Sequence, residues 1–170
     1  GTGVAAKHGI LIKDAQALER AHQVDLVAFD KTGTLTVGQP RVTAFAVPAG
    51  DDVQRAMAVA ASVQSGSEHP LARAVFAAAR ERGLPLAELE SVHAVPGRGT
   101  DGGRYLIGSL RWMQELGVSL DAIPYANTEG ATLSALVERV TGGLALRALL
   151  AFADEPKAGA AEALKALRAR

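Results

Sequence analysis

The stretch that decides the fold is Leu26-Val27-Ala28-Phe29-Asp30-Lys31-Thr32-Gly33-Thr34-Leu35-Thr36. Its apolar half ends abruptly at a carboxylate, and a turn rich in glycine and threonine follows. An apolar run of this length next to a turn predicts a parallel strand that is buried on both faces. Open α/β sheets place their chemistry just beyond the carboxyl ends of such strands, which makes Asp30 a candidate nucleophile.

The turn after Asp30 suits an anionic phosphoryl group. It offers backbone N–H groups and the hydroxyls of Thr32, Thr34 and Thr36. An aspartate can attack phosphorus and hold the group as an aspartyl-phosphate, which divides one transfer into two steps. The structural alternative is a strand that simply ends in a polar turn.

The complete string Asp30-Lys31-Thr32-Gly33-Thr34-Leu35-Thr36 resembles the phosphorylation signature of the P-type ATPases, which is carried on a haloacid-dehalogenase-like core. The resemblance implies that ATP phosphorylates Asp30 and that Lys31 and Thr32 belong to the catalytic turn. It also implies Mg²⁺, with the Asp30 carboxylate and the Thr32 backbone carbonyl as protein ligands. A solvated side chain is the alternative for Lys31.

Composition narrows the class of protein. Eighteen basic and eighteen acidic side chains give no net charge, so nothing points to nucleic acid or an anionic membrane surface as a partner. The absence of cysteine excludes disulfides and thiolate metal sites in this chain. No stretch approaches the roughly 20 apolar residues that span a bilayer. We therefore expect a cytoplasmic piece of a longer membrane transporter, because the family consists of membrane pumps.

Periodicity and turn residues outline the elements. We expect helices over most of 4–22, from Asp52 to about 64, from Pro70 to about 82, around 110–116 and over 162–170. Strands are expected at 24–29, 42–47, 133–137 and 144–148. Two further strands within 91–107 are expected to join through the glycine-rich segment 97–103. A last strand, 149–153, ends at Asp154 and is expected beside 24–29 in one parallel sheet.

This order predicts a nested α/β architecture, a partial haloacid-dehalogenase-like parallel sheet core with an inserted α+β domain. The insert is expected to be an antiparallel sheet flanked by helices that binds nucleotide. Residues 1–36 would form the first part of the phosphorylation domain, 37–147 the nucleotide-binding domain, and 148–170 the truncated return. An insertion of this size normally folds as its own domain.

Two features of the insert are ambiguous alone. Gly97-Arg98-Gly99-Thr100-Asp101-Gly102 matches G-x-G-x-x-G, but a strand follows where the dinucleotide fingerprint needs a helix, so that interpretation fails. A hairpin turn is the structural alternative. A lone histidine at a helix start, here His69, is more often a cap or a surface residue than a ligand.

Together these features resemble the nucleotide-binding domain of heavy-metal (type IB) P-type ATPases. The matching residues, in order, are Ser67-Glu68-His69-Pro70, Gly97-x-Gly99 and Ile107-Gly108. The resemblance implies an adenine pocket formed by Glu68, His69, Gly97, Gly99 and Gly108, where glycines let the backbone approach the ligand. Gln64 stands where the family often has Glu, and its neutral amide oxygen is a weaker acceptor.

The element Asp154-x-x-Lys157 resembles the Asp-x-x-basic hinge element of the family, which helps to hold nucleotide. The alternative is an acid and a base at a helix start. Further family elements, a Thr-Gly-Asp string, a phosphate-binding lysine and a second magnesium element, do not occur in 155–170. We therefore expect this chain to bind ATP weakly without sustaining turnover, and to depend on transmembrane, actuator and remaining phosphorylation segments.

The run Gly1–Lys13, with Leu18-Glu19 after it, looks more like copper(I) exporters than like zinc or cadmium exporters. We therefore expect a copper pump, with the localisation of an inner-membrane protein of a bacterium, and a zinc or cadmium pump as the alternative. A soluble haloacid-dehalogenase-like phosphatase with a cap domain is a second alternative, and a nucleotide-sensing module is a third. Such phosphatases carry a general acid two residues after the nucleophile, where this chain has Thr32.

Overall fold

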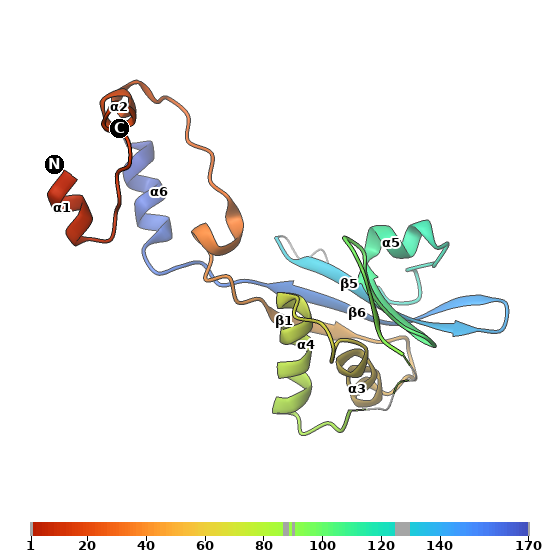
Figure 1. Ribbon diagram of the computed structural model, residues 1–170. Helices are drawn as coiled ribbons and strands as arrows, with labels where there is room; N and C mark the ends of the chain where they lie inside the picture. The colour runs from red at the N-terminus through yellow and green to blue at the C-terminus, as the bar shows by residue number, and fades with distance from the viewer. Residues whose placement is uncertain (1, 87–88, 90, 125–129, 170) are drawn as a thin grey trace. The chain divides into compact units, whose positions relative to one another are not determined.

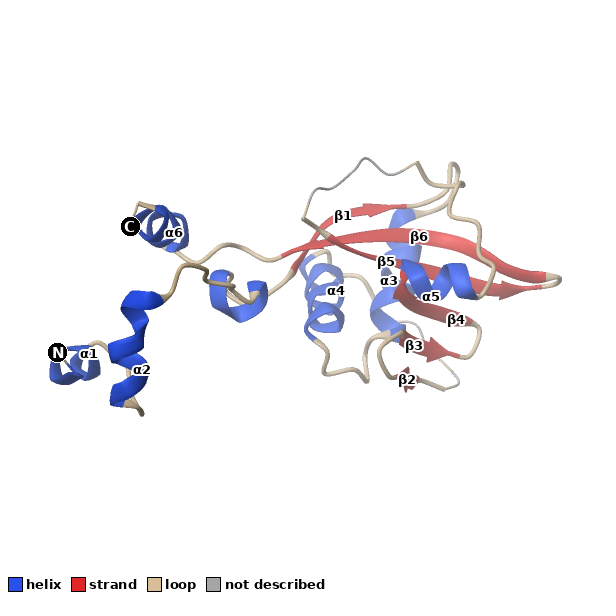
Figure 2. Cartoon of the chain, turned by 90° about the horizontal axis from the view of Figure 1, so that it is seen from above, coloured by secondary structure: helices blue, strands red, loops and turns tan. Residues whose placement is uncertain are grey.

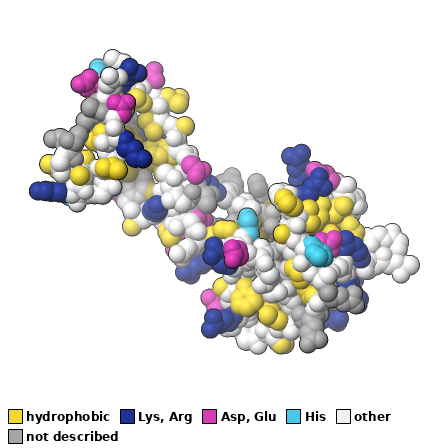
Figure 3. All heavy atoms as spheres, viewed as in Figure 1, with side chains coloured by type: hydrophobic (Ala, Val, Ile, Leu, Met, Phe, Trp, Pro, Cys, Tyr) yellow, Lys and Arg dark blue, Asp and Glu magenta, His cyan; other side chains and the backbone are white. Residues whose placement is uncertain are grey.

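The computed structural model describes residues 2–86, 89, 91–124 and 130–169. The chain divides into two compact units, an N-terminal unit of residues 1–30 and a C-terminal unit of residues 31–170. Each is described by itself (Figure 1). On the face drawn in Figure 3, acidic and basic side chains are interspersed over both units, as the neutral composition would suggest.

The N-terminal unit contains the short helices α1 (Thr2–Lys7) and α2 (Ala15–Arg20) and the 3₁₀ turn η1 (Ala21–Gln23). The helical region expected over most of 4–22 is interrupted, because Gly9 adopts a positive φ of 77° and 10–14 are not helical. The buried strand expected at 24–29 is not formed, since these residues are neither helix nor strand and all are exposed. A parallel strand needs neighbouring strands to pair with, and the described residues of this unit contain none.

The C-terminal unit is built on a six-stranded sheet in the order β1-β6-β5-β4-β3-β2, and every neighbouring pair is antiparallel. The strands are β1 (Arg41–Ala46), β2 (His93–Val95), β3 (Gly99–Gly102), β4 (Tyr105–Ser109), β5 (Thr132–Val140) and β6 (Gly143–Ala153). Figure 2 shows the β5–β6 hairpin extending past the other strands. The antiparallel sheet with flanking helices is the architecture expected for the insert.

Helices cover both faces of this sheet. Helices α3 (Val53–Val63) and α4 (Pro70–Glu81) pack on one face, and α5 (Leu110–Glu115) packs on the other. Successive strand residues therefore serve different cores: Ile107 packs against the α3–α4 side and Leu106 against the α5 side. A last helix, α6 (Ala160–Arg168), ends the described chain.

The helix starts follow their predicted caps. The Asp52 carboxylate accepts hydrogen bonds from the backbone N–H groups of Gln54 and Arg55 at 2.8 and 3.2 Å, and thereby begins α3. Pro70 opens α4, as expected from its fixed φ. Gly83 follows that helix with φ 63°, the left-handed conformation that glycine adopts at least cost.

Two further predictions about strands were wrong. Residues 91–107 hold three strands instead of two, because 99–102 forms a strand of its own between two glycine turns. Residues 149–153 are the end of β6, which pairs antiparallel with β1 and β5 and does not belong to a parallel sheet. β6 also runs through the expected domain boundary at 147/148. Its apolar character comes from burial on both faces, which parallel and antiparallel strands can share.

The carboxylate of Glu138 is buried and paired with two arginines. The Glu138 side chain on β5 is only 7% exposed and lies between two guanidinium groups. Arg104 Nε donates to it at 2.6 Å and Arg147 Nε at 2.7 Å. Burial raises the pKa of this carboxyl group, but the two arginines outweigh burial and lower the pKa below its usual value. Glu138 is therefore a satisfied ion-pair residue of the sheet.

Candidate active site

Asp30 is the last residue of the N-terminal unit and is exposed. The turn after it, η2 (Lys31–Leu35), is a single wide helical turn that closes when Thr36 N–H donates to the Lys31 carbonyl at 3.2 Å. Gly33 adopts a φ of 77° inside this turn. The predicted catalytic string thus folds as a defined turn, which includes the Thr32 backbone, while the Thr32 side chain lies outside the described part of the chain.

Hydrogen bonds of Asp154 and Lys157 with residues 33–39 hold this turn to the end of β6, and we call this set of contacts the clamp. The Thr36 hydroxyl donates to Asp154 Oδ2 at 2.6 Å. The same carboxylate accepts from Gly38 N–H at 3.0 Å and from Gln39 N–H at 3.1 Å. The Thr36 hydrogen bond, the two N–H groups and the charge of Lys31 lower the pKa of Asp154 despite partial burial.

Lys157 completes the clamp. Its backbone N–H donates to the Leu35 carbonyl at 2.8 Å, and its Nζ donates to the Gly33 carbonyl at 2.6 Å. Thr36 and Pro156 form an isolated antiparallel bridge, so the chain enters and leaves the sheet at the same place. Asp154 and Lys157 therefore have a structural role at this crossing, and a direct contact of Asp154 with nucleotide stays a prediction.

Lys31 makes a contact that the sequence does not foretell. Its Nζ donates to the Gly130 carbonyl at 2.9 Å, although 99 positions separate the two residues. Gly130 precedes β5, so this bond ties the turn 31–35 to the segment before that strand. The lysine remains exposed and keeps capacity for further hydrogen bonds.

The clamp predicts that the hydrogen bonds to the Asp154 carboxylate weaken at acid pH. Because the pKa of Asp154 is lowered on folding, its stabilising effect is present above the ordinary value of 3.8 and is lost as pH falls through the lowered pKa. The Gly38 and Gln39 amide signals should therefore shift in NMR spectra recorded from about pH 6 down to about pH 2, with a midpoint below 3.8. Asp154→Asn should remove this transition, and Glu155→Gln, the neighbouring exposed acid, should keep it. A midpoint at or above 3.8 would contradict the clamp.

His69 caps α4. Its Nδ1 accepts a hydrogen bond from Leu71 N–H at 3.2 Å, which leaves Nε2 as the protonated nitrogen of the neutral ring. The side chain is exposed, and Glu68 beside it is exposed as well. Ser67 shapes the loop, because its Oγ accepts from His69 N–H at 3.3 Å. The cap fixes the imidazole with a ring N–H directed away from the helix and available to a ligand.

Gln64 is joined to the glycine strands. The Thr100 hydroxyl on β3 donates to Gln64 Oε1 at 3.2 Å, and Thr100 is buried. Gln64 is also the C-cap residue of α3, so one side chain links the α3–α4 loop to β3. The oxygen expected to accept from adenine therefore already has one partner and keeps one lone pair.

Gly99 and Gly108 face each other across β3 and β4. A Cβ atom at Gly99 would lie 2.1 Å from the Ile107 carbonyl oxygen. A Cβ atom at Gly108 would lie 2.4 Å from the Arg98 carbonyl oxygen and 2.4 Å from Trp112 Cε3. Close packing within the protein thus demands both glycines without any ligand. Gly97 differs, because its Cβ would meet no atom within 4 Å and its φ is 69°.

The structure brings only some of the predicted site residues together. Gln64, Gly99 and Gly108 form one connected patch, and His69 and Glu68 lie on the loop that starts at Gln64. Asp154 and the turn after Asp30 form a separate group at the base of the sheet. Thr100 was missed by sequence reasoning, because a threonine inside a glycine-rich segment carries no signal of its partner.

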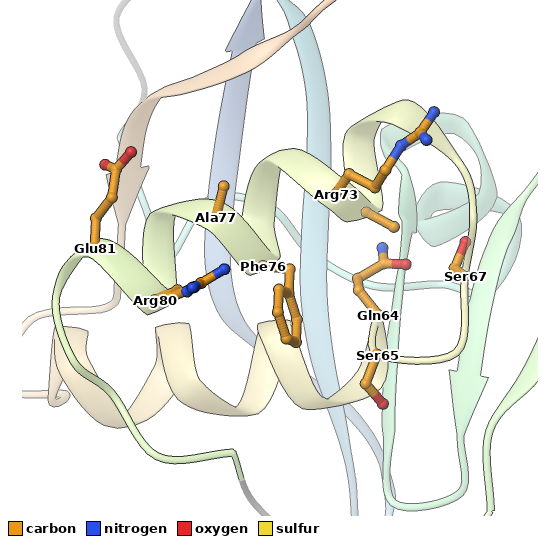
Figure 4. A pocket seen from close by; sticks show the side chains of 9 residues that line it. Gln64, Ser65, Ser67, Arg73, Phe76, Ala77, Arg80 and Glu81 are labelled. Atoms are coloured by element: carbon orange, nitrogen blue, oxygen red, sulfur yellow. The ribbon is translucent and has the colours of Figure 1, made fainter.

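A cavity of about 600 Å³ lies next to Gln64 and Ser67 (Figure 4). Phe76 projects from α4 toward α3 beside it and is 38% exposed. Arg73 and Arg80 lie on the same helix and also line it. The cavity offers an apolar ring next to basic and amide groups, which suits a ligand with a planar and an anionic part.

The Mg²⁺ site implied by the family resemblance stays a prediction. No cluster of three or more histidine, aspartate or glutamate side chains placed to hold a metal occurs within 2–86, 89, 91–124 and 130–169. Mg²⁺ usually keeps several waters and takes one or two carboxylates together with substrate phosphates. One carboxylate at Asp30 and the Thr32 carbonyl agree with that donor set.

Residues 24–170 match the haloacid dehalogenase-like hydrolase family, and the chain belongs to that family. Within this class, the chain resembles metal-transporting ATPases. The probable copper-transporting ATPase PacS of Synechococcus elongatus is 38% identical over 173 residues, which cover 99% of this chain and 23% of that protein.

Two groups of solved structures agree. The catalytic domain of the CPx-ATPase CopB-B, described for its conformational changes upon nucleotide binding, superposes with a TM-score of 0.69 at 25% identity, over 99% of this chain and 59% of that one. A zinc-transporting PIB-type ATPase in its E2·Pi state gives 0.62 at 34% identity, over 99% of this chain and 28% of that one. The chain thus spans less than a quarter of the length of PacS.

Proposed function

We propose that this chain is the ATP-handling part of a heavy-metal pump, in which ATP phosphorylates Asp30 to drive metal transport. The observation that carries the proposal is the string 30–36, folded as a turn and clamped at Thr36 by Asp154. Similarity over 99% of the chain to a copper-transporting ATPase supports it. The same similarity favours copper(I) as the cargo, and the zinc-transporting structure at 34% identity supports the alternative.

The chemistry follows from an aspartate at the start of a phosphate-binding turn. An Asp30 carboxylate oxygen attacks the γ-phosphorus of ATP, the bond to the β,γ-bridging oxygen breaks, and ADP leaves with that electron pair. Backbone N–H groups of the turn and the Lys31 ammonium group would stabilise the phosphoryl oxygens. When bound, Mg²⁺ would neutralise phosphate charge, with the Asp30 carboxylate and Thr32 carbonyl as ligands.

The residue two positions after Asp30 favours a pump over a phosphatase. Thr32 does not titrate near neutral pH, so it cannot act as the general acid that protonates a leaving group. An aspartyl-phosphate formed here should therefore persist long enough to drive a conformational change. A soluble phosphatase with a cap domain is the second candidate, and the haloacid dehalogenase-like family itself supports it.

The proposal divides the chain into nucleotide-binding and phosphorylation portions. Residues 37–147 would bind ATP, with 1–36 and 148–170 contributing to the phosphorylation domain. The chain would act on the cytoplasmic side of a membrane, for which a bacterial inner membrane is our proposal, together with transmembrane and actuator segments of the same protein. No helix in the described residues is long and apolar enough to cross a membrane.

The adenine site predicts the behaviour of two His69 variants. ATP should bind this chain with a dissociation constant of about 0.1 to 1 mM, or about −4 to −6 kcal/mol. His69→Ala and His69→Asn should both weaken binding by about tenfold, because both lose the imidazole N–H. His69→Ala should also cost about 1 kcal/mol of folding stability through the lost cap, whereas asparagine can cap the helix. Calorimetric titration and urea unfolding measure the two effects.

The asparagine variant separates binding from capping. His8→Asn, which changes an exposed histidine in the other unit, is the matched control and should leave ATP affinity unchanged. An unchanged affinity in His69→Asn would overturn the adenine site. The ATP-binding part of the proposal would then lose its main support.

A further inference from the structure

Six described arginines of the C-terminal unit have no carboxylate partner among the described residues: Arg41, Arg73 and Arg82, together with Arg55, Arg80 and Arg168. Five others form ion pairs: Arg98, Arg104, Arg111, Arg139 and Arg147. Arg41, Arg73 and Arg82 form none with any described residue.

Arg41, Arg73 and Arg82 line one groove. It has a volume of about 820 Å³ and runs between the segment 37–42 and the face of α4 from Pro70 to Arg82. Glu81 is the one carboxylate among its described lining residues. Arg82 is anchored, because its Nη1 donates to the Ala78 carbonyl at 2.9 Å. The groove therefore presents three guanidinium groups against one acid.

The spacing of the charges selects the kind of ligand. Arg73 lies in the first turn of α4 and Arg82 directly follows its last residue, and both line the groove. A ligand that reaches both ends of this helix must therefore be elongated. An extended peptide advances about 3.3 Å per residue, so acidic side chains a few residues apart on one strand face can reach both arginines.

We propose that this groove, formed by 37–42 and α4, binds an extended acidic segment of a partner polypeptide. Guanidinium groups pair with carboxylates in bidentate fashion, and Arg73 and Arg82 would each take one acid. Ala74, Ala77 and Ala78 also line the groove, and their small side chains leave room for an extended chain. The inference does not rest on the proposed ATPase function.

The test uses a seven-residue peptide with glutamates at its second and sixth positions, titrated into the chain at low salt and followed by fluorescence anisotropy. Arg73→Gln and Arg82→Gln should each weaken binding about tenfold, and added salt should weaken it in the wild type. Arg111→Gln is the matched control, because Arg111 is 89% exposed and pairs only with Glu115 four positions away. Thermal unfolding of each variant checks that the fold is intact.

Three further experiments distinguish an acidic peptide from other occupants of the groove. A peptide with glutamines at the same positions should bind at least tenfold more weakly, and equal binding would overturn the proposal. Inorganic phosphate that displaces the peptide at equal concentration would assign a general anion site instead. Concentration-dependent dimerisation that Arg82→Gln abolishes would assign the groove to a second copy. ATP titration of Arg82→Gln, expected to match wild type, separates this result from the ATP-binding proposal.

Discussion

Gly108→Ala is expected to destabilise the C-terminal unit by about 3 kcal/mol or more, beyond the usual cost of a surface substitution. The new methyl group would lie 2.4 Å from the Arg98 carbonyl oxygen and 2.4 Å from the Trp112 ring. A backbone oxygen cannot move away as a flexible side chain can, and Trp112 is a buried residue of α5 in the core on that face of the sheet. Relief would therefore require separation of β3 from β4. Urea unfolding followed by tryptophan fluorescence measures the loss.

Gly66→Ala is the matched control for this prediction. A Cβ atom added at Gly66 would lie 4.0 Å from Val92 Cγ1, which is ordinary van der Waals contact, and the φ of Gly66 is not positive. Its stability should stay within about 0.5 kcal/mol of the wild type. A Gly108→Ala protein that unfolds like wild type, yet loses ATP binding, would show that the glycine serves a ligand and not the packing of the strands.

Asp30→Asn is expected to abolish formation of a phosphorylated intermediate in the membrane-bound pump proposed above. Asparagine keeps the size of the side chain but removes the nucleophilic carboxylate, so no acyl phosphate can form. The measurement is incorporation of labelled γ-phosphate from ATP into acid-precipitated protein, with Mg²⁺ and copper(I) present. Hydroxylamine should release the label from the wild type, because it cleaves acyl phosphates.

Asp25→Asn is the control, since Asp25 is an exposed acid five positions before Asp30 in the same segment. It should be labelled like wild type. Zinc(II) in place of copper(I) tests the cargo, because labelling that requires zinc would favour the alternative metal. Persistent labelling of Asp30→Asn would exclude Asp30 as the phosphorylated residue, and ATP binding that persists without any labelling in wild type would favour a sensor.

Local signals allowed most of the insert to be predicted. The Asp52 cap and Pro70 each act within a few residues of their own position, so sequence alone located the starts of α3 and α4. A strand was expected at 42–47, and β1 covers Arg41–Ala46. These features depend on neighbours in sequence, which the sequence displays directly.

Features that depend on pairing were harder to predict. The run 24–29 has the composition of a buried strand, but pairing needs partners, and none lies in the described residues of its unit. β3 was hidden because Gly99 and Gly102 indicate a turn by composition. Their lack of a side chain instead permits close contact with neighbouring atoms, such as the Ile107 carbonyl oxygen at Gly99.

The candidate site shows the same difference between local sequence signals and long-range contacts. The strings around Asp30 and His69 carried recognisable signals, whereas the contacts that hold them did not. The bond from Thr36 to Asp154 spans 118 positions, and that from Lys31 to Gly130 spans 99. The arginine groove was missed for the same reason, because only the folded chain places Arg41 beside α4.

The most direct test of the central claim is an amide NMR titration of this chain with a non-hydrolysable ATP analogue, with and without Mg²⁺. We predict shifts that cluster at 67–71 and 97–108, where the His69 loop and the Gly99–Gly108 strands lie, with little dependence on Mg²⁺. Shifts confined to 30–36, with the sheet and its helices unaffected, would contradict the claim and favour a phosphatase core that carries an unrelated cap domain.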